Sequence, residues 1–145
     1  MSTIVLTTDL SQESRRAFAP TVKLANELDK NIVLLHVVPE LAALPYGSPY
    51  TVPVRPSSTE QGLKDAQTKL QDVATSLGSQ VQAEVIAATD VSQAIVKFAE
   101  EAHADFIALS THGRTGFRRL VMGSVAERVM RHATTPVICF PQKEA

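Results

Sequence analysis

Short apolar runs alternate with amphipathic segments along the chain, and this alternation limits the fold more than any other feature of the sequence. Between the runs, apolar residues recur at helical spacing, as at Phe18, Val22 and Ala25. Because such alternation favours parallel strands joined by right-handed crossover helices, we expect an α/β, Rossmann-like fold: an open five-stranded parallel sheet of order 3-2-1-4-5 with helices on both faces. The 145 residues fit one domain, 1–145. The expected strands span residues 3–9, 31–38, 81–88, 105–110 and 136–140.

Local signals predict how several helices begin and bend. Ser11, Asp90 and Ser124 each precede a helical pattern and are good N-cap residues, and Gln93 completes a capping pattern with Asp90. Pro20 falls inside the first helical pattern, where a missing N–H predicts a kink. The residues expected to face the core from the last helix are Val125, Val129 and Met130.

Residues 39–58 have no clear period and hold five of the eight prolines. This composition predicts a long loop. It is either a variable surface connection or a lid over a ligand, because long loops in compact domains are often functional.

Composition narrows the classes of function. The net charge is −1, so an extended nucleic-acid-binding surface is not expected. Cys139 is the single cysteine, so no disulfide forms within the chain. The first residues lack the basic and apolar regions of a signal peptide, and no run of about 18 apolar residues predicts a membrane span. We therefore expect a soluble protein of the cytoplasm, without membrane or nucleic-acid partners.

A candidate site follows from the predicted topology. In open parallel sheets, ligands bind outside the carboxyl ends of the strands where the strand order reverses, here between the first and fourth strands. Gly123 and Ser124 precede the last helix, whose first N–H groups and dipole form an anion site. The candidate residues at these ends are Thr7, Thr8, Asp9, Leu109, Ser110, His112, Gly113, Arg114, Gly123, Ser124 and Val125.

Spacing alone leaves two interpretations open. The chain contains neither the P-loop pattern nor the G-x-G-x-x-G fingerprint. The glycines between the fourth strand and the last helix either let the backbone approach a phosphate or serve only turns.

Three stretches of the sequence resemble the universal stress protein family: "IVLTTDLSQES", "LLHVVPE" and "DFIALSTHGRTGFRRLVMGSVAERVMRHATTPVICF". The nucleotide-binding branch of that family carries G-x2-G-x9-G-[ST]. Gly113, Gly123 and Ser124 match this pattern, whereas Ser110 stands in place of its first glycine. The seryl side chain would either crowd a ribose or donate a hydrogen bond to it.

The resemblance implies a homodimer that binds ATP, with Mg or Mn possible between the phosphates, and that pairs through its last strand, Val137–Phe140. It implies that Thr8 and Asp9 hold the ribose or the adenine edge and that Val37 packs on adenine. It further implies phosphates near His112 and Gly113 and on Gly123, Ser124 and Val125.

Three functions remain open at this point. The first is a stress-response regulator that binds an adenine nucleotide. The second is a slow ATPase, although the sequence shows no general base beside a fixed nucleophile and hence no catalytic residue. The third is a family member that acts through protein contacts without ATP, which the serine at position 110 favours. No protein metal site is expected, because histidine and cysteine lack zinc spacing.

Overall fold

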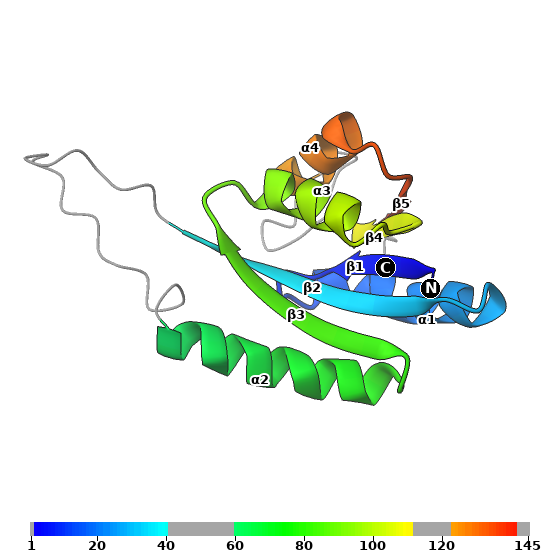
Figure 1. Cartoon of the computed structure of the whole chain (residues 1–145), viewed down its shortest axis with the longest axis horizontal. Helices are drawn as coiled ribbons and strands as arrows, with labels where there is room; N and C mark the ends of the chain where they lie inside the picture. The colour runs from blue at the N-terminus through cyan, green and yellow to red at the C-terminus, as the bar shows by residue number, and fades with distance from the viewer. Residues whose placement is uncertain (1, 41–59, 112–122, 142–145) are drawn as a thin grey trace, which may run out of the picture.

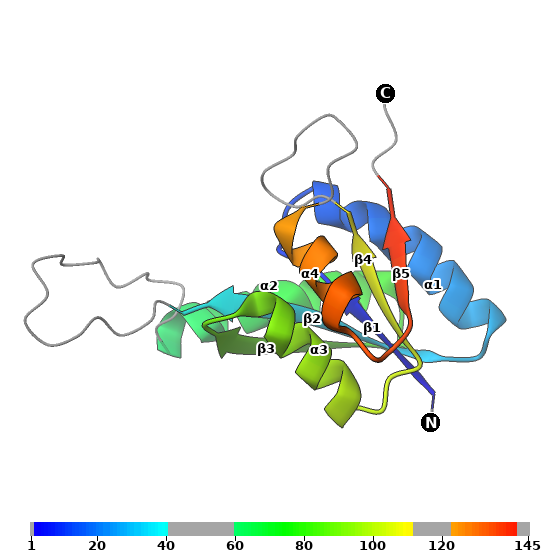
Figure 2. The same cartoon turned by 90° about the horizontal axis from the view of Figure 1, so that it is seen from above.

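The computed structural model describes residues 2–40, 60–111 and 123–141. In these residues five parallel strands form one sheet of order β3-β2-β1-β4-β5, which confirms the predicted α/β fold and strand order. Viewed from above, the strands lie side by side in that order (Figure 2). They are β1 (Thr3–Thr7), β2 (Asn31–Pro39), β3 (Val81–Ala88), β4 (Phe106–Ser110) and β5 (Val137–Phe140).

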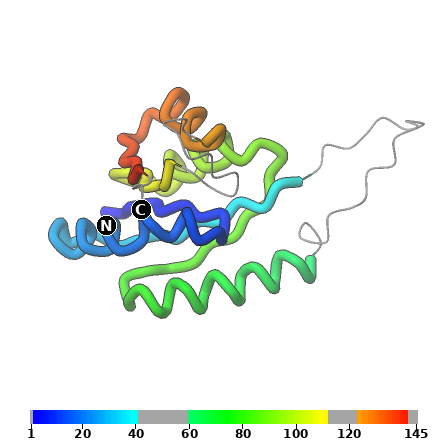
Figure 3. Tube along the Cα trace, turned by 180° about the vertical axis from the view of Figure 1, so that it is seen from behind, coloured from blue at the N-terminus to red at the C-terminus, as the bar shows by residue number. Residues whose placement is uncertain are grey.

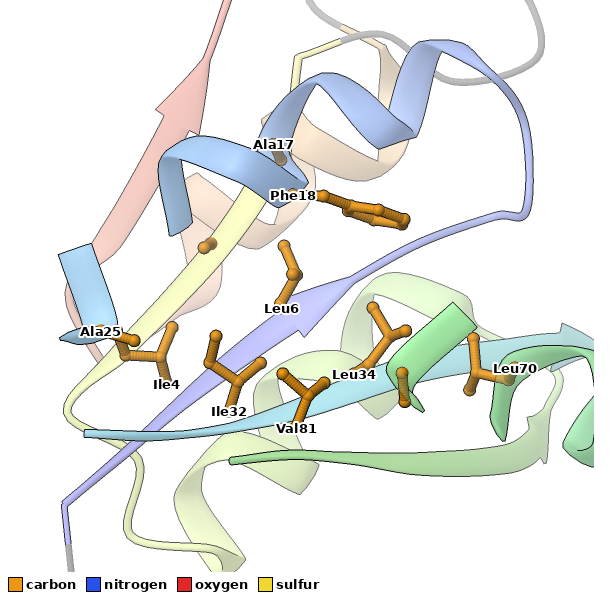
Figure 4. Packing of buried hydrophobic residues seen from close by; sticks show 11 residues of the cluster. Ile4, Leu6, Ala17, Phe18, Ala25, Ile32, Leu34, Leu70 and Val81 are labelled. Atoms are coloured by element: carbon orange, nitrogen blue, oxygen red, sulfur yellow. The ribbon is translucent and has the colours of Figure 1, made fainter. Parts of the chain in front are cut away.

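Helices cover both faces of the sheet (Figures 1 and 3). One face carries α1 (Phe18–Glu27) and α2 (Glu60–Leu77), and the other carries α3 (Val91–Glu101) and α4 (Ser124–His132). Alternate residues of each strand therefore enter two separate cores. Leu6 and Leu34 pack with α1 and α2 (Figure 4), whereas Val5 and Leu35 pack with α3 and α4.

The register of the central strand, β1, places the candidate site at the carboxyl ends of the strands. Val5 pairs with Val33 of β2 on one side and with Ile107 of β4 on the other. The carboxyl ends of β1 and β4 consequently meet where the strand order reverses, which is the position at which this architecture forms a crevice.

The segment after β1 differs from the single kinked helix that was predicted. A 3-10 turn, η1 (Glu13–Ala17), precedes α1, and Pro20 lies in the first turn of α1. Because N–H groups of a first helical turn have no partner inside the helix, Pro20 is accommodated there and the helix type changes two residues earlier instead. The Ser11 hydroxyl accepts the Ser14 N–H at 3.2 Å, although Gln12 occupies the cap position itself.

Two of the predicted features of α4 are wrong. Gly123 is its N-cap and Ser124 its first residue, so the helix begins one position earlier than the cap prediction implied. Ala126 and Val129 face the core, whereas Val125 and Met130 are 39% and 48% exposed. A helix of nine residues contacts the sheet along one narrow stripe, and positions three apart occupy it here.

The predicted cap of α3 is confirmed. The Asp90 carboxylate accepts the Gln93 N–H at 3.1 Å. That bond and a second one from the Ser92 hydroxyl lower the pKa of Asp90. Across the three described ranges, no helix is both long and apolar enough to cross a membrane.

Candidate functional site

A cavity of about 250 Å³ opens at the carboxyl ends of β1 and β4. Its walls come from β1, β2 and β4 and from the starts of η1, α3 and α4. Nine of the residues predicted from the sequence line it: Thr7, Thr8, Asp9, Val37, Leu109, Ser110, Gly123, Ser124 and Val125. The other three predicted residues, His112, Gly113 and Arg114, lie outside the described residues.

The cavity also contains residues that were not predicted. Two of them could have been predicted from the sequence pattern. Leu35 lies two positions before Val37 and therefore shares its face of the strand, and Ile95 lies on the apolar stripe of α3. The full set of unpredicted lining residues is Ser14, Leu35, Val91, Ile95, Thr111 and Ala126.

The inner part of the cavity is apolar. Leu35, Val37, Ile95 and Leu109 line it and are all buried among the residues that pack under α3 and α4. A flat, weakly polar group is the kind of ligand that such walls accommodate, because they offer dispersion contacts and few hydrogen-bond partners.

A hydrogen-bonded turn leaves β1 at the edge of the cavity. Leu10 adopts a φ of 67°, and its N–H donates to the Thr8 hydroxyl at 3.0 Å. The Ser14 hydroxyl donates to the Ser11 carbonyl at 2.7 Å, so its single proton is committed. Thr8 must then be the donor in its 2.7 Å contact with Ser14. The Thr8 hydroxyl is therefore held by the turn and has no proton left for a ligand.

Asp9 is oriented by the same turn. Its Oδ1 accepts the Ser11 N–H at 2.9 Å and also the Ser11 hydroxyl. Both bonds are made to the same carboxylate oxygen, so they fix the orientation of the side chain. Asp9 is the one carboxylate among the described residues that line the cavity.

The opposite wall is the start of α4. Its first N–H groups have no partner inside the helix and lie at the positive end of the helix dipole. The Gly123 N–H donates to the Thr111 carbonyl at 2.6 Å, and the Thr111 N–H donates to the Phe140 carbonyl of β5 at 3.1 Å. These two bonds anchor the helix start to the end of the sheet.

Comparison with known proteins identifies the family. The model of the universal stress protein family matches residues 1–141. The chain belongs to the universal stress protein family. A universal stress protein of Methanocaldococcus jannaschii is 32% identical over 145 residues, an alignment that covers 97% of this chain and 84% of the relative.

Solved universal stress proteins share the fold. The protein of Archaeoglobus fulgidus in complex with dAMP has a TM-score of 0.67 and 20% identity, with 96% of each chain covered. A family protein of Arabidopsis thaliana with AMP bound has a TM-score of 0.62 and 19% identity, with 99% of this chain and 93% of the other covered.

Two further side chains of this universal stress protein lie outside the cavity. His36 is a core residue, and its Nδ1 lies 2.9 Å from the Thr8 carbonyl. Cys139 is half-buried, its thiol donates to the Met130 sulfur at 3.1 Å, and burial raises its pKa. Within the part of the chain that the structure describes, no three His, Cys, Asp or Glu residues could together hold a metal ion.

Proposed function

We propose that this universal stress protein binds an adenine nucleotide, in the first place ATP, in the cavity between the carboxyl ends of β1 and β4. The observation that carries the proposal is a single cavity with an apolar interior, a carboxylate at one rim and a helix N-terminus at the other. A nucleoside phosphate has the complementary sequence of groups: a flat base, a sugar with hydroxyl donors, and anionic phosphates.

The size of the cavity supports this arrangement. Sites for drug-sized ligands usually measure about 300–1,000 Å³, so a cavity of about 250 Å³ suits a base and its ribose rather than a whole triphosphate. In the proposed complex the adenine packs against Val37 and Leu109, with its edge read by the Val37 backbone. The phosphates then extend outwards along the start of α4.

Polar groups at the two rims would hold the rest of the ligand. Asp9 would accept hydrogen bonds from the ribose hydroxyls, and Thr7 and Ser110 line the same rim. Ser124 and Val125 would bind phosphate through backbone N–H groups and the seryl hydroxyl. Gly123, whose N–H already donates to the Thr111 carbonyl, would let the phosphate approach the helix start closely because it has no side chain. Contacts from His112, Gly113 and Arg114 remain predictions.

Binding of dAMP and AMP by two proteins of the same fold supports an adenine nucleotide as the ligand. A bound Mg or Mn would be held mainly by phosphate oxygens and water, because Asp9 is the one acidic side chain of the described cavity wall. The same wall supports binding of ATP rather than its fast hydrolysis. Asp9 accepts hydrogen bonds from Ser11, and the Thr8 hydroxyl donates its proton to Ser14, so neither is set up as a general base or a nucleophile.

The proposal includes a homodimer formed through β5. This strand is the last in the sheet order, and its residues Val137–Phe140 are apolar and half-buried. An apolar edge strand is a ready template for pairing, and a partner strand would cover it. We also place this stress-response regulator in the cytoplasm, where a free thiol such as that of Cys139 stays reduced.

Titration calorimetry with ATP and magnesium tests the proposal, with AMP and GTP as further ligands. Gly123 has a φ of −56° and a ψ of 152°, which any residue can adopt, so Gly123→Val adds a side chain at the helix start without backbone strain. We expect this variant to bind ATP at least tenfold more weakly, a change of roughly 1.4 kcal/mol.

The matched control is Gly62→Val, which makes the same substitution in α2, away from the cavity. This control should bind ATP as tightly as the wild type. If the wild type gives no binding heat with ATP or AMP, and native mass spectrometry detects no bound nucleotide, the proposal is wrong. A function through protein contacts without ATP would then be the better explanation.

A further inference from the structure

We propose that His36 is a positioning residue for Asp9. The inference rests on the proposed nucleotide function, because Asp9 is the carboxylate assigned to the ribose there. His36 does not line the cavity. It would act through the Thr8 carbonyl, from the other face of the sheet.

The alternation of β2 places His36 opposite the ligand. Leu35 and Val37 line the cavity and pack under α3 and α4. His36 lies between them, so its side chain leaves the strand on the face of Leu34, which packs with α1 and α2. The imidazole is only 8% exposed there.

The contact with Thr8 fixes which ring nitrogen carries a proton. His36 Nδ1 lies 2.9 Å from the Thr8 carbonyl oxygen, which can only accept. Nδ1 is therefore the donor, whether the ring is neutral or charged. The Thr8 N–H in turn donates to the Leu35 carbonyl at 2.9 Å. Two consecutive residues of β2 thus hold both backbone polar groups of Thr8.

These two hydrogen bonds hold Thr8 directly after β1 ends and before a turn with an unusual backbone conformation. The ladder between β1 and β2 ends with the pair Thr7 and Leu35, and three residues later Leu10 adopts a left-handed φ of 67°. A non-glycine residue keeps that conformation only when its surroundings impose it. Because the peptide between Thr8 and Asp9 is planar, a fixed Thr8 carbonyl also fixes the direction in which Asp9 leaves the strand.

Three substitutions separate this role from simple packing. His36→Asn places an amide N–H the same number of bonds from Cα as Nδ1, whereas His36→Phe keeps the ring and loses the donor. His36→Gln keeps an amide but places it one bond farther out, and serves as the second test if the phenylalanine variant does not fold. Leu34→Val, on the same face of the same strand, is the control for lost packing.

Two measurements on the full chain test the proposal, each with the melting temperature recorded. In calorimetry with ATP and magnesium, we expect the affinity of His36→Asn and Leu34→Val for ATP to stay within about threefold of the wild type. His36→Phe and His36→Gln should bind ATP at least tenfold more weakly, a change of roughly 1.4 kcal/mol. In hydrogen exchange without ligand, the amides of Leu10 and Ser11, which donate to Thr8 and Asp9, should lose at least tenfold protection in the same two variants only.

The proposal is overturned if His36→Phe keeps wild-type affinity and amide protection, or if the asparagine variant loses as much as the phenylalanine variant. The two proposals fail separately. If the wild type binds no adenine nucleotide, the nucleotide function fails, and amide exchange at Leu10 and Ser11 still decides whether His36 holds the turn that carries Asp9.

Discussion

Asp9 holds the turn after β1 and is proposed to contact the ligand, and substitution can separate these two roles. Its Oδ1 accepts two hydrogen bonds from Ser11, each worth about 1 kcal/mol net. Asp9→Ala removes both, so the free energy of unfolding should fall by about 2 kcal/mol, which corresponds to roughly 4–8 °C in Tm for a chain of this length. Asp9→Asn keeps an oxygen that can accept both bonds in a weaker, uncharged form, so its Tm should fall by less than that of Asp9→Ala.

Ligand affinity should respond differently from stability. Asp9→Asn removes the charge that strengthens a hydrogen bond from a ribose hydroxyl, so affinity for ATP should fall about tenfold, or roughly 1.4 kcal/mol. Circular dichroism melts and calorimetric titration with ATP and magnesium at pH 7 read the two effects. Asp65→Asn is the control and should change neither, because Asp65 lies in α2, outside the cavity wall, and accepts a hydrogen bond from Gln61 one turn away. Equal losses of Tm in the alanine and asparagine variants would refute the assignment of the Ser11 bonds, and wild-type affinity in Asp9→Asn would refute the ligand contact.

Three further predictions concern other parts of the chain. Ser110→Gly enlarges a small cavity and should raise affinity for ATP in calorimetry, whereas a fall would show that the hydroxyl contacts the ligand. Ile138→Lys places a charge in the apolar edge strand β5 and should shift the sedimentation profile towards monomer, and an unchanged profile would argue against pairing through this strand. Asp90→Ala removes the cap of α3 and should lower Tm at neutral pH. Because folding lowers the pKa of Asp90, its stabilisation is present above the unfolded pKa of about 4 and is lost as the pH falls through the folded value, so the Tm difference should disappear in acid.

The periodicity of the sequence was sufficient to predict the strands of the sheet, but it did not predict where the helices begin. Strand runs such as residues 31–38 are apolar on both faces, a pattern that is typical of a buried parallel strand. Helix ends depend instead on contacts made by distant parts of the chain. Local pattern placed Pro20 inside one helix, whereas the turn held by Thr8, Ser11 and Ser14 starts the segment as a 3-10 helix.

The site was predictable where it follows from topology. Thr7 ends β1 and is followed by Thr8 and Asp9, whereas Leu109 and Ser110 end the adjacent β4. Strand order alone brings these residues to one cavity. The contact between His36 and Thr8 was not predictable, because 28 positions separate the two residues and only the register of β1 and β2 brings them together. The polar partner of His36 is moreover a backbone carbonyl, which no residue pattern marks.

Hydrogen-bond direction, which only the structure reveals, gives the cavity an orientation. At the β1 rim, the proton of Thr8 is donated to Ser14 and an ionised Asp9 carboxylate is an acceptor only, so these two side chains accept hydrogen bonds from a ligand rather than donate them. At the opposite rim, the first turn of α4 presents N–H donors at the positive end of a helix dipole. The proposed ligand would therefore offer donors towards Asp9 and anionic acceptors towards α4, with an apolar, flat part against Val37 and Leu109. The hydroxyls, phosphates and base of an adenine nucleotide meet these three requirements in one molecule, whereas an inorganic anion or a purely apolar ligand meets only one.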